Sequence, residues 1–178
     1  MNGEPAIGTL PVALSDEPDD RLARLFDVHH VRLYRLARRL VPAADDALDL
    51  VQETFLRAAR SAASVPTGAD YEEAWLVRVL INVQRDRWRQ SVVRTNHRRS
   101  IRPETSTPSH EAATVARTLV QDALKALPPR RRAVLVMFEL EGLTVGEIAS
   151  LLGVTSVTVR WHLSRGRRDL LRVLSATR

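Results

Sequence analysis

The chain of 178 residues contains no cysteine, a single lysine (Lys125) and only eight aromatic residues (three Trp, two Tyr and three Phe). Without cysteine it can form neither a disulfide framework nor a thiolate metal site, which fits a reducing compartment. No apolar run reaches membrane-spanning length, and the first residues are acidic rather than basic, so neither a membrane helix nor a secretory signal is indicated. We therefore expect a cytoplasmic protein that makes no contact with a membrane.

The groupings of residues that carry enzyme chemistry are missing as well. The sequence has no Gly-rich phosphate loop, no Cys–His pair and no cluster of carboxylates placed to form an active site. His29 and His30 are adjacent, but no carboxylate or third histidine lies at ligand spacing, so structural or surface roles are favoured. The sequence thus predicts no catalytic residue, no metal and no cofactor, and an enzyme acting on nucleic acid is the weakest hypothesis.

What the chain does have is arginine. Lysine and arginine total 27 against 21 acidic residues, which gives a net charge of +6, and all but one of the basic residues are arginine. This surplus favours a polyanionic partner such as nucleic acid. Arginine suits bidentate contacts with phosphate and guanine, although a GC-rich genome would produce the same bias.

Residues 143–168 carry the most informative pattern. Thr144 followed three residues later by Glu147 is a capping box, which predicts the start of a helix. Gly153 would end that helix, because glycine adopts the left-handed conformation of a sharp turn without steric cost. Together with the helix that follows, this pattern predicts a helix-turn-helix; an ordinary helical hairpin inside a bundle is the alternative.

The second helix of this motif is expected to enter a DNA major groove, since its free face is basic. We expect Val157, Val159 and Leu163 to face the core. The remaining side chains of the motif are expected to point mostly outward: Thr158, Arg160, Trp161, His162, Ser164 and Arg165.

Periodicity divides the chain into four parts. Residues 1–15 lack periodicity and basic residues, which predicts a disordered acidic tail. Residues 16–92 show helical apolar spacing, residues 93–110 lose it within a polar, proline-containing stretch, and residues 111–178 regain it. The expected fold class is therefore all-α, with two small helical domains joined by a flexible linker, the second a helix-turn-helix.

The helix expected from Ala43 to about Ser64 is acidic in its first half. We expect Leu48, Val51, Phe55 and Ala59 to face inward, with Leu50 and Leu56 exposed. Acidic residues early in a helix suit the helix dipole, so the charges alone do not require a partner. An acidic face does not bind DNA, however, so in a basic protein a protein partner is an equally good explanation. The face comprises Asp46, Asp49, Gln52 and Glu53.

The next helix is expected to start at Asp70, with Glu73 completing a cap, and to be strongly basic. Eight arginines and a single acid, Asp86, lie between residues 78 and 102, and Asp86 can pair with Arg85 or Arg89. Arginines, an amide and nearby aromatic rings are what a single-stranded nucleic acid requires; a solvated basic face is the alternative. The candidate residues are Tyr71, Arg78, Asn82, Arg85, Trp88 and Arg89, whereas Trp75 is more consistent with the core.

Two separated sets of motifs resemble one family. The first set is Asp49-Leu50-Val51-Gln52-Glu53 and Trp75-Leu76-Val77-Arg78, followed by Asn82 and Asp86. The second is Leu127-Pro128-Pro129, Glu141-Gly142-Leu143-Thr144, Leu152-Gly153-Val154 and Thr158-Val159-Arg160. These stretches resemble regions two and four of bacterial extracytoplasmic-function (ECF) sigma factors. The presence of both sets of motifs in this order, joined by a short linker, is strongly specific for this family. The acidic N-terminal tail, however, is not part of the family pattern.

The resemblance implies a factor that directs core RNA polymerase to specific promoters, with a stand-alone helix-turn-helix repressor or activator as the alternative. It implies contacts with the β′ clamp and the β flap of the polymerase, and in many members an anti-sigma partner. The clamp would be bound by Asp46, Asp49, Leu50, Gln52 and Glu53.

The resemblance also assigns the two DNA elements. The non-template strand of the melted minus-ten element would contact Tyr71, Arg78, Asn82, Arg85, Trp88 and Arg89, with one base flipped against the loop at 67–72. The minus-thirty-five duplex would contact Thr144, Thr158, Arg160, Trp161, His162, Ser164 and Arg165. The linker would run toward the RNA exit channel. Trp161 and His162 occupy positions that vary between members, so no promoter sequence is implied.

Overall fold

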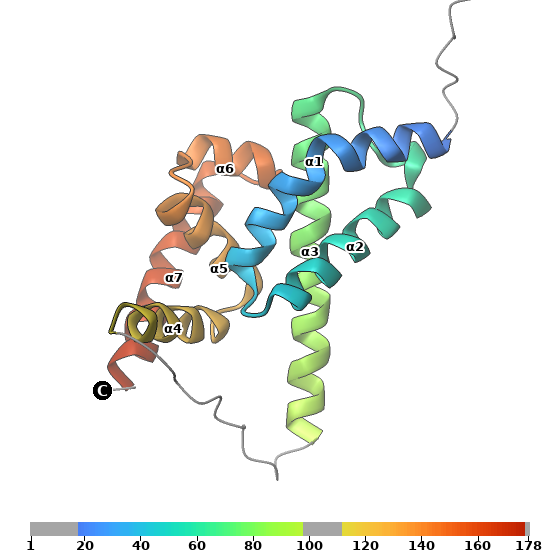
Figure 1. The fold of residues 1–178 in the computed structure, drawn as a ribbon. Coiled ribbons are helices and arrows are strands. Elements are labelled where there is room, and N and C mark those ends of the chain that lie inside the picture. The colour runs from blue at the N-terminus through green and yellow to red at the C-terminus, as the bar shows by residue number, and fades with distance from the viewer. Residues whose placement is uncertain (1–17, 98–111, 177–178) are drawn as a thin grey trace, which may run out of the picture.

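The computed structural model describes residues 18–97 and 112–176, which contain seven α-helices and no strand (Figure 1). The expected tail at 1–15 and most of the expected linker lie outside these residues. The all-α class is confirmed. The helices are α1 (Pro18–Leu40), α2 (Ala44–Arg60), α3 (Ala69–His97), α4 (Ala112–Lys125), α5 (Pro129–Leu135), α6 (Val145–Leu152) and α7 (Ser156–Ala176).

Helices α1, α2 and α3 pack together as the first helical bundle. Helix α1 forms because its apolar residues recur every three or four positions and so share one face. That face buries Leu33, Leu36 and Leu40 almost completely. Each contributes about 1.5–3 kcal/mol by leaving water, and truncating Leu33 to alanine is expected to cost about 2–5 kcal/mol. The helix ends just before Pro42, because a residue that precedes proline is disfavoured in helical geometry.

The buried face of α2 differs from the expected one. Leu50 is fully buried and Leu48 is 48% exposed, so the expectation that Leu48 faces inward and Leu50 outward is wrong. Ala59 is likewise exposed. The physical reason is that the residues buried along α2 recur every three or four positions and so share one face, and Leu48 and Ala59 lie outside that face. The residues buried along α2 are Ala47, Leu50, Val51, Thr54, Phe55 and Ala58.

Helix α3 begins and ends outside its expected bounds. It starts at Ala69, so Asp70 lies in the first turn rather than at the cap. It continues to His97, past the domain boundary expected after residue 92, which makes the first residues of the expected linker helical. The buried His29 of α1 places its Nε2 atom 3.4 Å from Glu72 Oε2 of α3. His29 is therefore a structural link between helices, as expected.

The helix-turn-helix forms as the sequence predicts. Thr144 Oγ1 accepts a hydrogen bond from the Glu147 backbone N–H (3.2 Å), and Glu147 Oε2 accepts one from the Thr144 N–H (2.7 Å). Glu147 Oε2 accepts hydrogen bonds from both the backbone N–H and the hydroxyl of Thr144, and these two bonds hold the pKa of Glu147 below its usual value. Gly153 ends α6 with φ at +62°. Thr155 then caps α7 by accepting a hydrogen bond from the Thr158 N–H (3.2 Å).

Between α5 and α6 the chain widens into a π-helical segment, η2 (Val136–Leu140), which the sequence did not indicate. Its last residue, Leu140, is 55% exposed. Just before this segment, Leu135 at the end of α5 packs against the buried Gly166 of α7. A Cβ atom on Gly166 would lie 2.8 Å from Leu135 Cδ1, so any larger residue at this close crossing of α5 and α7 would force the Leu135 side chain to shift.

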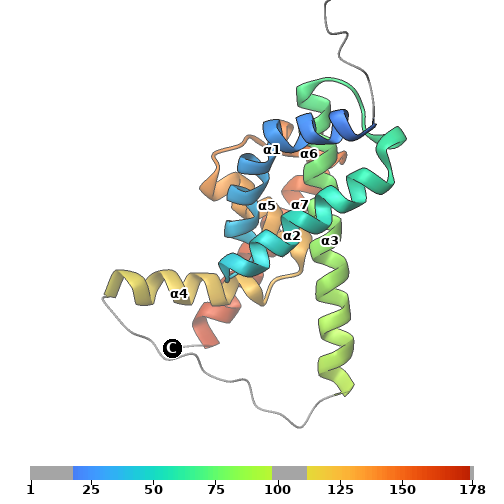
Figure 2. The same ribbon diagram turned by 45° about the vertical axis from the view of Figure 1, so that its right-hand side comes forward.

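The two bundles lie against each other, with α5 and α6 beside α1 and α3 (Figures 1 and 2). Arg132 of α5 is buried and donates a hydrogen bond to the carbonyl of Leu40 at the end of α1 (2.7 Å). Burial lowers its pKa to about 10, so it remains a cation at neutral pH. Glu141, whose side chain is 6% exposed, lies 2.6 Å from Arg32 and 3.0 Å from Arg39. These charged side chains join the two domains.

Candidate polymerase and nucleic-acid interfaces

The acidic face of α2 is open to solvent. Asp46, Asp49 and Gln52 are exposed, while Glu53 is half-buried and pairs with Arg57 at 3.1 Å. Leu50, expected to contribute to this face, is buried in the core and cannot contact a partner. The exposed leucines on this side of α2 are Leu48 and Leu56. The face is thus acidic with apolar residues between the acids.

A groove of about 680 Å³ runs between α1 and α2 beside this face. Phe26, 44% exposed, forms part of it, stacked on His30 and tilted against Phe55 at 5.0 Å between ring centroids. Leu22 and Leu56 also line it. A hydrophobic groove that lies beside an acidic helix face and includes Asp27 in its lining suits an amphipathic helix of another protein. Neither Phe26 nor Leu22 was among the residues expected to contact a partner, so their part in this groove was missed.

Arg57 connects the acidic helix to the basic one. Its Nη1 atom donates to Asp86 Oδ2 of α3 at 3.1 Å, and Arg85 lies 3.5 Å from the other oxygen. Partial desolvation opposes ionisation of Asp86, but the hydrogen bond from Arg57 and the two positive charges hold its pKa below the usual value. The expected pairing of Asp86 with Arg85 is confirmed, whereas the contribution of Arg57 was not anticipated.

The polar stripe of α3 is partly covered by the helix-turn-helix. Arg78 and Asn82 line a small enclosed pocket together with Leu152, Val154 and His162. A Cβ atom on Gly153 would lie 2.9 Å from Arg78 Nη1, so the arginine extends over the turn of the motif. The structure therefore brings the first half of the stripe into contact with the second domain.

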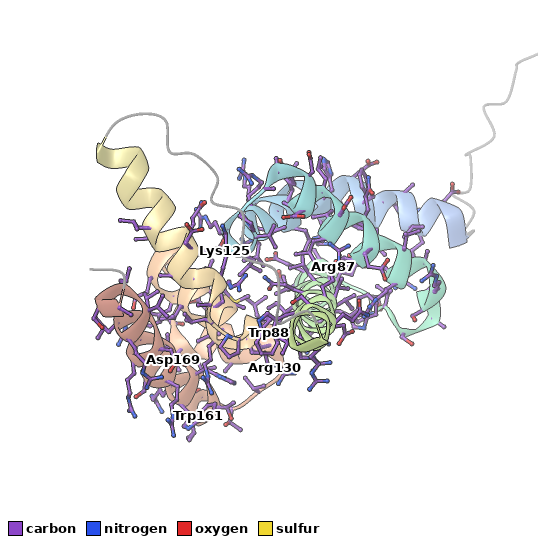
Figure 3. The ribbon with its side chains drawn as sticks, turned by 90° about the horizontal axis from the view of Figure 1, so that it is seen from below. Arg87, Trp88, Lys125, Arg130, Trp161 and Asp169 are labelled. Carbon is purple, nitrogen blue, oxygen red and sulfur yellow. The ribbon has the colours of Figure 1, made fainter. Side chains whose placement is uncertain are left out.

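The remaining candidates on α3 are more accessible. Tyr71 is 70% exposed at the start of the helix, and Arg89 is exposed, while Arg85 and Trp88 are half-buried. Arg87 and Trp88 point away from different sides of α3, and Arg87 points toward α2 (Figure 3). There its guanidinium donates a hydrogen bond to the backbone carbonyl of Asp49 at 3.0 Å. Trp75 is partly buried against the hydrophobic core, as expected.

Helix α7 presents an exposed stripe on the side away from α1 and α2. Arg160, Ser164 and Arg165 are exposed, and Trp161 is 48% exposed at the edge of the molecule (Figure 3). The guanidinium carbons of Arg131 and Arg165 lie 5.5 and 5.9 Å from the Trp161 ring centroid, so the ring is flanked by two cations. This arrangement keeps an aromatic plane and several arginines together on one solvent-facing surface.

Three expected contact residues are placed differently from the rest. Thr144 is exposed but holds the capping box, and Thr158 is half-buried with its hydroxyl 3.0 Å from that of Thr155. His162 is half-buried and lines the pocket shared with α3, so the expectation that it lies on the outward face is wrong. Desolvation, together with the charges of Arg130 and Arg131, lowers the pKa of His162.

In the described parts of the chain no group of three or more His, Cys, Asp or Glu residues is placed to hold a metal ion. Within those same residues, no helix is long and apolar enough to cross a membrane. The described residues present an acidic surface on α2 and two arginine-containing stripes, one on α3 and one on α7.

Comparison with known families matches both halves of the chain. Residues 25–92 match the family model "Sigma-70 region 2", and residues 117–170 match "Sigma-70, region 4". The ECF RNA polymerase sigma factor SigE of Mycolicibacterium smegmatis is 35% identical over 181 residues, covering 94% of this chain and 68% of SigE. SigM of Mycobacterium tuberculosis is 34% identical, covering 87% and 79% of the two chains. SigL of the same species is 36% identical, covering 86% and 90%.

Solved structures show the same fold. RpoE from Bartonella quintana, in complex with the anti-sigma factor NepR, superposes with a TM-score of 0.60 at 23% identity, covering 90% of this chain and 99% of RpoE. CnrH, in complex with the cytosolic domain of CnrY, superposes with a TM-score of 0.57 at 25% identity, covering 91% and 92%. The likeness extends over both helical domains.

Proposed function

This chain belongs to the ECF RNA polymerase sigma factors, which act in promoter-specific transcription initiation, and we propose how its surfaces divide that task. In this proposal α2 holds core RNA polymerase, α3 binds the melted minus-ten strand and α7 binds the minus-thirty-five duplex. The observation that carries the proposal is that one chain presents an exposed acidic face on α2 and an exposed arginine stripe on α7. A protein that only binds DNA would not require the exposed acidic face of α2.

The polymerase contact is assigned to α2. Asp46, Asp49 and Gln52 form the charged part of the surface, and the groove beside Phe26 and Leu56 supplies apolar area. Charge complementarity across such a surface accelerates association and excludes wrong partners, while the apolar groove supplies affinity. In family terms the partner is the β′ clamp, and the second domain meets the β flap.

Duplex recognition is assigned to α7. Arg160, Trp161, Ser164 and Arg165 lie on its exposed stripe. Arginine can donate two hydrogen bonds to guanine in the major groove, and flanking arginines reach phosphates. The helix-turn-helix geometry places the first turns of α7 closest to the base edges.

Single-strand recognition is assigned to α3 and to the residues just before it. Tyr71 is exposed where a flipped base can stack, and Asn82 offers an amide for base edges. Arg78, Arg85 and Arg89 supply phosphate contacts. In the structure, however, Arg78 and Asn82 face the helix-turn-helix rather than solvent.

It follows that the two domains must separate when both DNA elements are bound. The minus-ten and minus-thirty-five elements lie about 25 base pairs apart, or roughly 85 Å at 3.4 Å per base pair. Domains joined by Arg132 and Glu141 cannot span that distance. We propose that polymerase binding at α2 accompanies opening of this contact and exposes the α3 stripe.

Two of the structural relatives were solved as complexes, RpoE with the anti-sigma factor NepR and CnrH with the cytosolic domain of CnrY. On that basis we propose an anti-sigma protein as a further partner of this chain. Such a partner would act by holding the closed arrangement of the two domains or by covering α2.

The experiment that tests the proposal is run-off transcription with purified core polymerase and genomic fragments, followed by mapping of the start sites. We expect the chain to make core polymerase initiate at defined sites that share two spaced elements. A chain that leaves core polymerase inactive, yet binds operator duplex tightly by itself, would instead be a stand-alone repressor or activator.

A further inference from the structure

Val157 is exposed where a buried residue was expected. It is the second residue of α7, and 71% of its surface is accessible, whereas Val159 and Leu163 of the same helix are 0% and 5% exposed. The expectation that Val157 faces the core is therefore wrong. A β-branched residue is also a poor choice for an exposed helical position, because its side chain loses rotamer freedom there. Neither packing nor helix propensity accounts for a valine at this position.

The position of Val157 on α7 is informative. Residues three, four, seven and eight positions apart share a helix face, so Val157 begins the same stripe that continues through Arg160, Trp161, Ser164 and Arg165. Every later member of that stripe is polar or aromatic and exposed. Val157 is the member nearest the N-terminus of the helix, which is the part of a recognition helix that approaches base edges most closely.

Valine can contribute to DNA recognition in one way only. It has no donor or acceptor for a phosphate or a base edge, so it gains free energy by apolar contact. In the major groove the C5-methyl group of thymine is the apolar feature that distinguishes one base from the others.

We propose that Val157 is a specificity residue that packs against the methyl group of a thymine in the upstream promoter element. The proposal rests on the proposed function, because it requires α7 to lie in the major groove of that element. It adds a determinant that arginine contacts cannot provide, since those select guanine or phosphate.

The test begins with the full-length chain bound to core polymerase. Upstream elements are selected from random duplexes with this complex, and each thymine of the selected element is then replaced singly by deoxyuridine. That replacement removes one methyl group and changes nothing else in the base pair. At one position we expect a three- to fivefold loss of affinity, the size of one buried methyl group.

The same substitution series is repeated with Val157→Ala. We expect weaker binding to the thymine-containing element and a deoxyuridine effect close to onefold, because the methyl group has lost its partner. Circular dichroism checks that the variant is folded; Val157 makes little contact with the core, so the fold should be retained. Leu171→Ala is the matched control, since Leu171 is 68% exposed on the same helix but about 21 Å further along it. We expect no change in thymine dependence for this control.

Arg160→Ala separates failure of this inference from failure of the proposed function. If Arg160→Ala weakens binding to the selected element but deoxyuridine has the same effect on wild type and Val157→Ala, only the role of Val157 is overturned. A selected element without thymine in the window contacted by the first turn of α7 overturns it as well. If Arg160→Ala leaves selection unchanged too, α7 is not the duplex-binding helix and the proposed function itself fails.

Discussion

The two arginine stripes of this chain differ in how far they are available. On α7, Arg160 and Arg165 are exposed beside Trp161. On α3, Arg78 lies over the turn at Gly153, and Arg85 is engaged with Asp86. The stripe proposed for duplex DNA is thus ready in the free chain, and the stripe proposed for single-stranded DNA is half covered. Duplex exists before a promoter melts and an unpaired strand only afterwards, so this difference follows the order in which the two substrates appear.

The cover over α3 is held by polar contacts as well as by packing. Arg132 bonds the end of α1, and Glu141 lies between Arg32 and Arg39. Glu141 is nearly buried, but Arg32 and Arg39 remain 33% and 42% exposed, so these ion pairs are screened by water and add only modest net stability. The contact is therefore suited to a change between two arrangements.

The largest effect is expected from a charge reversal on the acidic face of α2, which belongs to neither arginine stripe. Asp49→Lys should weaken binding to core polymerase by about 3 kcal/mol, roughly 100-fold, because a like charge facing a basic partner costs several kcal/mol. Pull-down and titration with labelled core polymerase measure this loss. Asp49 is preferred to Glu53, whose replacement would also break the pair with Arg57.

Asp70→Lys is the matched control for this charge reversal, since Asp70 is exposed in the first turn of α3. It should leave polymerase affinity within about twofold of wild type, because surface substitutions away from a contact have small effects. Equal losses for Asp70→Lys and Asp49→Lys would show that net charge matters and not the α2 face.

The second-largest effect is expected on the exposed arginine stripe of α7. Arg160→Ala should weaken recognition of the upstream element by about 1–3 kcal/mol, the usual size for an arginine that contacts a base. Binding of the polymerase complex is measured on the specific element and on scrambled duplex. A loss that is identical on both sequences would mean that Arg160 contacts phosphate only.

A smaller effect is expected from a substitution that weakens the contact between the two domains and so uncovers the arginine stripe of α3. Glu141→Gln removes the carboxylate that Arg32 and Arg39 share, so the closed arrangement should lose about 1 kcal/mol. The radius of gyration from X-ray scattering of the free variant should rise. Glu139→Gln breaks an exposed pair with Arg167 inside the second domain and should leave the radius unchanged. Identical radii for the two variants would remove Glu141 from the account.

The smallest expected effect is a pH dependence of stability, which arises from His162 in the pocket between α3 and the helix-turn-helix. The pKa of His162 is lowered by desolvation and by Arg130 and Arg131, and Arg78 of α3 faces the same pocket. The unfolded chain takes up a proton near pH 6.5 that the folded chain resists. Stability should therefore be intact above about pH 6.5 and fall as the pH drops below it. Melting curves of His162→Gln should show a flatter pH dependence than wild type; a steeper one would contradict the assignment.

Local sequence chemistry predicted the helix-turn-helix well. Thr144 with Glu147, and Gly153 after α6, form their cap and turn from residues close in sequence, so no distant contact was needed to foresee them. The all-α fold followed from periodicity in the same way. The acidic α2 face was also correctly located, although its function stays a prediction.

The burial expectations that were wrong concern positions where contacts between residues far apart in the sequence determine which side chains are buried. Along α2 leucines occur on several sides, so the pattern did not fix which side is buried, and Leu50 rather than Leu48 faces the core. Val157 was assigned inward for being apolar, although the turn before it directs it to solvent. Burial of Arg132 and Glu141 could not be predicted, because both are charged and meet residues of the other domain about 100 positions away in sequence.

We expect the arginine stripes of α3 and α7 to bind their two DNA elements together only when the domains separate. Because the chain lacks cysteine, spin labels can be attached at Val31→Cys on α1 and Leu171→Cys on α7, both exposed positions. Pulsed electron paramagnetic resonance then gives the distance between them, first in the free chain and then in the complex with polymerase and promoter. We predict one short distance for the free chain and an increase of several tens of ångströms in the complex, as elements about 25 base pairs apart require. An unchanged distance in a complex that initiates transcription would contradict the account.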